Sequence, residues 1–195
     1  VSSPERAELL NAMGCEFVVD RKAEGYQFWS DENTQDESEW RRLGKQVRGM
    51  IGDDPDIVFE HPGRSTMGAS VFITKRGGKI VTCAATSGYM IEYDNRHLWM
   101  KLKSIISSHF ANYQEAWEMN RLIDQGAIVP VMSDVYDLTH VGDAALKVHR
   151  NEAEGKLGVL CLSPEEGMGI TDQAKREVVG EDRINLFRRM AGTKA

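Results

Sequence analysis

Residues 56–85 read DIVFEHPGRSTMGASVFITKRGGKIVTCAA, and this stretch decides the predicted fold. Two short apolar runs, at 56–60 and 77–85, stand on either side of a helix-like segment at 63–75. A strand, a helical crossover and a second strand are the parts of a parallel βαβ unit. The runs are apolar throughout rather than at alternate positions, which is typical of a parallel sheet covered on both faces.

The same alternation of helices and strands continues along the chain and predicts an α/β fold. Asn112 and Glu115 have the spacing of a capping box at the start of one helix. Residues 21–35 are polar and predict a loop, and residues 173–190 predict a final helix or a loose tail. Further helices are predicted at 4–13, 36–52, 94–103, 112–126 and 138–156, and further strands at 15–20, 104–110 and 157–162.

Composition narrows the class of protein. The 195 residues carry a net charge of −6 without a basic block, which argues against nucleic acid and anionic membranes as partners. No apolar run approaches the roughly 20 residues that a membrane helix needs. The cysteines Cys15, Cys83 and Cys161 form no C-x-x-C pair that would predict a zinc site. We therefore expect a cytoplasmic protein without a metal. The chain begins at Val1 as if inside a strand, so we also expect a piece of a longer protein.

Residues that follow predicted strands are the candidate binding residues, because open α/β sheets bind ligands at the carboxyl ends of their strands. Ser2, Ser3 and Arg6 follow the first strand, and Arg21 is a further cation nearby. Small polar residues followed by cations suit the 2′-phosphate of NADPH. The alternative is that the serines cap a helix and the arginine is solvated, with no ligand involved. The Gly-rich turn that precedes such a site in dinucleotide-binding folds is absent from this sequence.

Two further strand ends offer candidates. Glu60 and His61 are placed to line a cofactor crevice, although Pro62 and Gly63 by themselves predict a turn there. Cys83 and Ala84 end the following strand. Small residues at that point would let a flat ring approach the backbone, or they would pack tightly.

Arg96 and His109 are the candidates nearest the next strand. Arg96 belongs to a local basic patch at 96–103, which would hold substrate phosphates or form a solvated helix face. His109 stands at the carboxyl end of strand 104–110, either as a ligand-binding group or as a structural histidine that caps the next helix.

Three collinear stretches, at 56–89, 92–122 and 155–169, resemble the crotonyl-CoA carboxylase/reductases, a branch of the medium-chain dehydrogenase/reductase superfamily. The resemblance implies a Rossmann domain, a doubly wound parallel sheet, inserted into a GroES-like catalytic domain. Residues 1–126 would then be a partial Rossmann domain that binds NADPH, without its first strand and Gly-rich turn. Residues 127–195 would be the closing segment that returns to the catalytic domain.

The resemblance also implies a reaction. NADPH would give a hydride to the β-carbon of crotonyl-CoA, and the enolate would capture CO2 at the α-carbon to give ethylmalonyl-CoA. A non-carboxylating NADPH-dependent enoyl-CoA or quinone reductase is an alternative, as is a fragment that only binds or oligomerises. Strand 104–110 would pair two subunits, giving a homodimer or, with further contacts, a tetramer.

The resemblance assigns roles to the candidate residues. His109 matches the histidine that anchors CO2. The remaining matches are Ser3, Arg6 and Arg21 at the 2′-phosphate of NADPH, Glu60, His61, Cys83 and Ala84 on the nicotinamide side, and Arg96 near the adenine of CoA.

Overall fold

The computed structural model describes residues 1, 3–167 and 169–191, so Ser2, a predicted cofactor residue, lies outside the described residues. The chain forms two compact units. The first contains Val1–Pro4 and Val19–Phe110, and the second contains Glu5–Val18 and Ala111–Ala195. No helix in the described part of the chain is long and apolar enough to cross a membrane.

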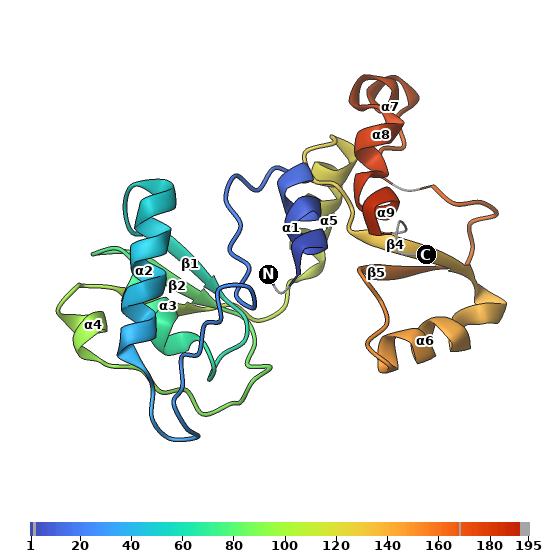
Figure 1. The fold of residues 1–195 in the computed structure, drawn as a ribbon. Coiled ribbons are helices and arrows are strands. Elements are labelled where there is room, and N and C mark those ends of the chain that lie inside the picture. Colours follow the sequence, from blue (N-terminus) through green and yellow to red (C-terminus); the bar gives the residue numbers. More distant parts are fainter. Residues whose placement is uncertain (2, 168, 192–195) are drawn as a thin grey trace. The chain divides into compact units, whose positions relative to one another are not determined.

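A three-stranded parallel sheet forms the centre of the first unit (Figure 1), which confirms the predicted α/β fold with parallel strands. Its strands are β1 (Ile57–Glu60), β2 (Lys79–Thr82) and β3 (Ser104–Ser107), in the order β1-β2-β3. Helix α3 (Met67–Ile73) is the crossover between β1 and β2. In the sheet register the last residues of the three strands are neighbours, so the strands end level.

Two helices pack closely in the first unit. Helix α2 (Glu37–Ile51) begins after Asp36, whose side chain accepts a hydrogen bond from the Ser38 N–H. Its Trp40 is buried against α3, where a Cβ atom at Gly68 would lie 2.5 Å from the indole ring. Glycine is therefore required for this approach of α3 to α2. The apolar core beneath α3 consists of Met67, Val71 and Ile80.

Within the first unit taken by itself, the two faces of the sheet are covered unequally. Side chains alternate between the faces of a strand. Glu60 and Ile80 are buried, whereas Ile57 is 63% and Phe59 67% exposed. The buried face is the one on which Met67 and Val71 of α3 pack against Ile80.

Residues 15–20 form no strand, which corrects the prediction for this segment. The Val1 ammonium donates to the Val19 carbonyl at 2.7 Å, and the Arg21 N–H donates to the Val1 carbonyl at 3.0 Å. These two hydrogen bonds tie Val1 to the segment at 19–21. Helix α4 (Arg96–Trp99) is also shorter than predicted.

The second unit contains α1 (Pro4–Ala12), α5 (Tyr113–Asp124) and a parallel pair of strands, β4 (Met132–Asp137) and β5 (Lys156–Leu160). The predicted capping box of α5 is confirmed: the Glu115 N–H donates to Asn112 Oδ1 at 2.9 Å, and the Asn112 N–H donates to the Glu115 carboxylate at 2.8 Å. Strand β4 was missed because its sequence, MSDVYD, has few apolar residues.

Short helices complete the second unit. The predicted helix at 138–156 is a 3-10 turn, η1 (Leu138–His140), followed by α6 (Val141–His149). Asn151 has a φ of 57°, in the left-handed region that ends a helix. The end of the chain forms α7 (Gln173–Val179), α8 (Glu181–Ile184) and α9 (Leu186–Ala191) rather than a single helix.

Candidate functional site

The loops after β1 and β2 meet closely at the carboxyl ends of the strands. Gly63 has a φ of 86°, and a Cβ atom there would lie 2.9 Å from Ala85 Cα. Ser87 donates from its hydroxyl to the Pro62 carbonyl at 2.7 Å, and the Ser65 N–H donates to the Ser87 hydroxyl oxygen at 2.9 Å. These contacts fix the two loops against each other.

Glu60 holds the first of these loops from below. Its carboxylate is 2% exposed and accepts hydrogen bonds from the Gly63 N–H at 2.9 Å, from the Thr66 hydroxyl at 2.6 Å and from the Ser70 hydroxyl. Such donors are what a buried carboxylate without a cation needs. Glu60 was expected to line a crevice, but its side chain is placed to shape the loop that carries His61.

His61 and Cys83 are exposed at the same edge of the sheet, and Ala84 is half-buried beside Cys83. The level ends of β1 and β2 bring these residues to one side of the unit. The structure therefore gathers three of the predicted cofactor residues where a ligand of an α/β sheet would bind.

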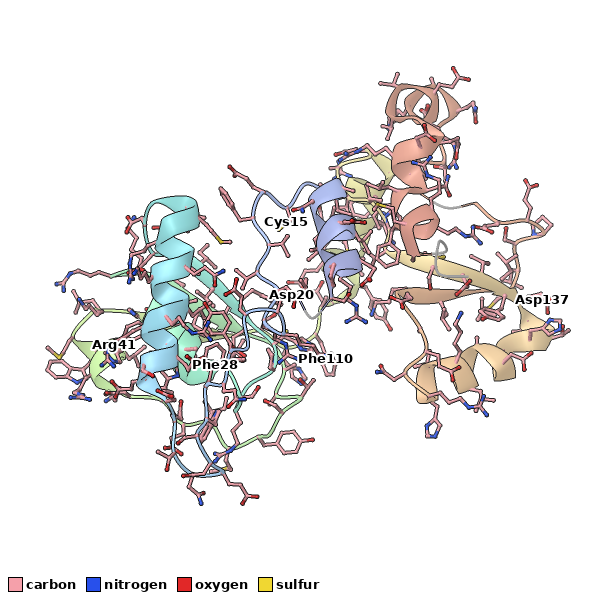
Figure 2. The ribbon with its side chains drawn as sticks, in the orientation of Figure 1. Cys15, Asp20, Phe28, Arg41, Phe110 and Asp137 are labelled. Atoms are coloured by element: carbon pink, nitrogen blue, oxygen red, sulfur yellow. The ribbon has the colours of Figure 1, made fainter. Side chains whose placement is uncertain are left out.

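His109 lies two residues beyond β3. The ladder continues as far as Ser108, whose N–H donates to the Thr82 carbonyl at 2.9 Å. The His109 imidazole is exposed and lies edge-on to the ring of Phe110, with 3.9 Å between centroids; Figure 2 labels Phe110. The imidazole thus stands at the third strand end, open to a ligand.

The predicted phosphate residues fall in different units. Ser3 and Arg21 belong to the first unit, and Arg6 belongs to the second unit, in α1. Arg6 and Arg21 are exposed. Whether they converge on one phosphate stays a prediction.

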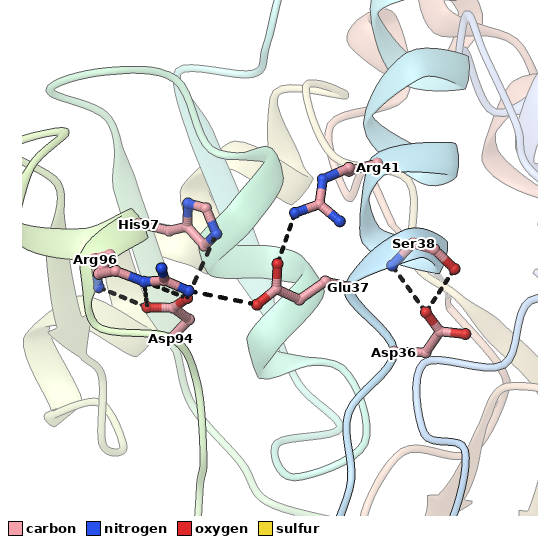
Figure 3. Close-up of polar contacts among 7 residues, drawn as sticks. All are labelled: Asp36, Glu37, Ser38, Arg41, Asp94, Arg96 and His97. Carbon is pink, nitrogen blue, oxygen red and sulfur yellow. Dashed lines mark hydrogen bonds and ion pairs between the residues drawn. The ribbon is translucent and has the colours of Figure 1, made fainter.

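Arg96 belongs to a chain of charged side chains between α2 and α4 (Figure 3). Its Nη2 lies 2.5 Å from Asp94 Oδ2 and 3.7 Å from Glu37 Oε1. The second oxygen of Glu37 accepts from Arg41 at 2.7 Å. Hydrogen bonds from Arg96 lower the pKa of Asp94 to about 2, so this carboxylate is ionised at neutral pH.

The imidazole of His97 lies against this chain of charges, but its Nε2 is not hydrogen-bonded to it. Its buried Nε2 has no hydrogen-bond partner, and Asp94 Oδ2 is 3.8 Å away. The imidazole ring lies edge-on to Phe72, with 4.9 Å between centroids. Burial lowers the pKa of His97, which favours the neutral ring.

A pocket of about 510 Å³ opens beside His97, and cations dominate its lining. The buried Lys103 donates from Nζ to the carbonyls of Val71 and Phe72, at 2.6 and 3.1 Å. Burial lowers its pKa to about 8. The charged lining residues are Arg48, Lys75, Arg76, Lys101 and Lys103, together with Asp53 and Asp54.

The sequence identified this basic region, because the patch at 96–103 contains Arg96 and Lys103. It did not identify the carboxylates of Glu37 and Asp94. The spacing Asp94-x-x-His97 was a usable signal, since residues three apart share one face of a helical turn. Nothing in the sequence brings Glu37 to that turn.

Comparison with known proteins decides the family. Residues 1–125 match the family model described as zinc-binding dehydrogenase. The chain belongs to the zinc-binding dehydrogenase family. As a member, it is 60% identical to a crotonyl-CoA reductase of Streptomyces collinus over 96% of this chain and 42% of that protein. It is 32% identical to a crotonyl-CoA carboxylase/reductase of Cereibacter sphaeroides over 86% of this chain and 41% of that protein.

A solved structure of a 2-octenoyl-CoA carboxylase reductase, CinF, in complex with NADP and 2-octenoyl-CoA is similar to this family member. It has a TM-score of 0.85 and 44% sequence identity over 97% of this chain and 43% of that chain. The resemblance found in the sequence is confirmed. The chain spans less than half the length of the relatives that it matches.

Proposed function

We propose that an enzyme containing this chain carries out the NADPH-dependent reductive carboxylation of an enoyl-CoA. The observation that carries the proposal is the match over 97% of the chain to a carboxylase reductase bound to NADP and 2-octenoyl-CoA. In this enzyme residues 1–126 would form the Rossmann part, and residues 127–195 would close the GroES-like catalytic domain.

The residues at the strand ends fit a dinucleotide. Gly63 has no side chain and Ala84 has a small one, so both leave room for a flat ring near the backbone. A side chain at position 63 would also collide with Ala85. Bound NADPH would supply the hydride for the β-carbon of the substrate. Glu60 fixes the loop that carries His61, and Ser3, Arg6 and Arg21 supply hydroxyl and cationic groups for the 2′-phosphate. Ser2 is assigned to the same phosphate by sequence alone.

His109 is the proposed anchor for CO2. An imidazole N–H at an exposed strand end can donate a hydrogen bond to the oxygen on which charge develops as the carboxylate forms. A donor fixed before the reaction stabilises that charge more than a mobile water does.

The cationic pocket beside His97 supports an acyl-CoA substrate. Its lysines and arginines would pair with the phosphates of CoA, with Arg96 as a nearby guanidinium. The part of the full-length relatives that this chain does not span would supply the rest of the acyl site.

A second copy of the chain is the proposed partner at β3. This strand is at one edge of the three-stranded sheet, and all four of its residues are exposed. Unpaired backbone groups on an edge strand favour pairing with another strand. We place the enzyme in the cytoplasm, which the three free, exposed cysteines support.

Incubation of the full-length enzyme with crotonyl-CoA, NADPH and isotope-labelled bicarbonate tests the reaction. We expect labelled ethylmalonyl-CoA in proportion to the NADPH consumed. Oxidation of NADPH with unlabelled butyryl-CoA as the product would support the alternative, a non-carboxylating reductase, which the name of the Streptomyces collinus relative favours. If the full-length protein oxidises no NADPH, the remaining alternative is that the chain serves only in binding or oligomerisation.

A further inference from the structure

We propose that Glu37, Asp94 and His97 form a binding site for one divalent transition-metal ion of the zinc or cobalt type (Figure 3). One carboxylate oxygen of Glu37, one of Asp94 and a ring nitrogen of His97 all lie within 4.8 Å of one another. The site does not rest on the proposed function, and it replaces the expectation of a chain without metal ligands.

The donor set selects the class of ion. Two carboxylate oxygens and one imidazole nitrogen are ligands that zinc and cobalt accept readily. Magnesium and calcium prefer ligand sets made of oxygen alone. The imidazole is therefore the ligand that excludes the alkaline-earth ions.

Local structure holds the ligands in place. Packing against Phe72 and Trp40, at centroid distances of 4.9 and 6.4 Å, fixes the orientation of the His97 ring. Arg41 binds Glu37 Oε2 and leaves Oε1 facing the other ligands. These contacts orient the ligands before an ion binds.

The nitrogen of His97 is the observation that points to a missing ligand. Nε2 is buried and has no hydrogen-bond partner, and the nearest carboxylate oxygen, on Asp94, is too far at 3.8 Å. A buried polar atom without a partner is unfavourable. An ion between Nε2 and the two carboxylates would satisfy it.

Arg96 competes with the ion for the same carboxylates. Its guanidinium binds Asp94 and lies 3.7 Å from Glu37, but its side chain is 68% exposed and can swing into solvent. An ion must displace this cation, so the structure predicts that removal of the guanidinium tightens metal binding.

A second pair in the chain provides a matched control. Asp137 and His140 have the same Asp-x-x-His spacing, but His140 Nδ1 already contacts the Asp137 carboxylate at 2.8 Å. No third ligand joins them in the described part of the chain, where the only such group of three is the proposed site. Loss of His140 should therefore leave metal binding unchanged.

Titration of the full chain with Co²⁺ and Zn²⁺, followed by calorimetry and by the visible absorption of bound Co²⁺, tests the proposal. We expect one equivalent of Co²⁺ to bind, with no competition from Mg²⁺. His97→Phe, which keeps the ring packing, should weaken binding by about tenfold or more. Arg96→Ala should tighten it several-fold, and His140→Asn should not change it.

Two results would overturn the proposal. One is wild-type affinity in His97→Phe, and the other is an Arg96→Ala variant that binds no more tightly than the wild type. Because unfolding cannot produce tighter binding, the Arg96 variant separates a real site from damage to the fold.

Discussion

Glu60 shows how a single residue can serve a site without facing it. Its buried carboxylate accepts three hydrogen bonds that fix the turn after β1. Glu60→Gln would replace one acceptor oxygen by an amide N–H that faces donors. We expect a loss of about 1–3 kcal/mol in the free energy of unfolding, measured with urea. The exposed Glu92→Gln is the control and should change stability by less than about 0.5 kcal/mol.

His109 carries the residue-scale prediction for the reaction. In the full-length enzyme, His109→Asn should lower the ratio of ethylmalonyl-CoA to butyryl-CoA by about tenfold or more, because the shorter amide side chain places its N–H donor away from the developing carboxylate. Product analysis by mass spectrometry measures this ratio. His149→Asn, on the exposed end of α6, is the control. An unchanged ratio in the His109 variant would show that this residue does not anchor CO2.

At the scale of elements, two glycines in helices give opposite predictions. A Cβ atom at Gly68 in α3 would lie 2.5 Å from the Trp40 ring, whereas one at Gly49 in α2 would meet nothing within 4 Å. Gly68→Ala should destabilise the chain by about 1–3 kcal/mol through overpacking. Gly49→Ala should stabilise it by about 0.5–1 kcal/mol, since alanine favours the helix. Urea unfolding of both variants compares them, and equal shifts would contradict the packing of α3 on α2.

The ion pair of Asp137 and His140, which links β4 to η1, makes the stability of the fold depend on pH. Hydrogen bonds from Thr139 and His140 lower the pKa of Asp137 to about 2, and Asp137 in turn raises the pKa of His140 above its ordinary 6.5. The raised pKa of His140 stabilises the fold below pH 6.5, and this contribution is lost as the pH rises through the folded value. The lowered pKa of Asp137 stabilises the fold above its ordinary value of 3.8, and this contribution is lost as the pH falls toward 2. The pair therefore contributes most between about pH 4 and 6.5.

An NMR titration of the His140 ring tests this pair. Its midpoint should lie above 6.5 in the wild type and return toward 6.5 in Asp137→Asn. The same midpoint for His140 in both proteins would show that the carboxylate does not hold the imidazolium.

At the scale of the whole molecule, the proposed pairing of two subunits through β3 can be tested at its edge. Ser104 and Ser108 donate their N–H groups toward β2, so the N–H of Ser107 points to the open edge. Ser107→Pro should keep the fold, because proline is tolerated where an edge N–H has no partner. It should shift the full-length enzyme from dimer toward monomer in analytical ultracentrifugation, while Ser107→Ala should not. A dimer that survives the proline would have its interface elsewhere.

Elements with a strong local pattern could be predicted, and elements that depend on distant partners could not. Helix α5 was predicted from Asn112 and Glu115, which lie within one turn and form their bonds locally. Strand β4 was missed because pairing with β5 stabilises it, and that partner is distant in the sequence. The predicted strand at 15–20 failed for the converse reason, since an apolar run needs a continuous partner to form a ladder.

The sequence by itself determined the parallel βαβ order, the place of His61, Cys83 and His109 at strand ends, and the family to which the chain belongs. These features follow from local periodicity and from residue identities, which can be read directly from the sequence. Only the tertiary structure decided that Glu60 is buried beneath its loop, and that Glu37 meets Asp94 and His97. The path of the chain between α2 and α4 brings these residues together, and no spacing in the sequence encodes that approach.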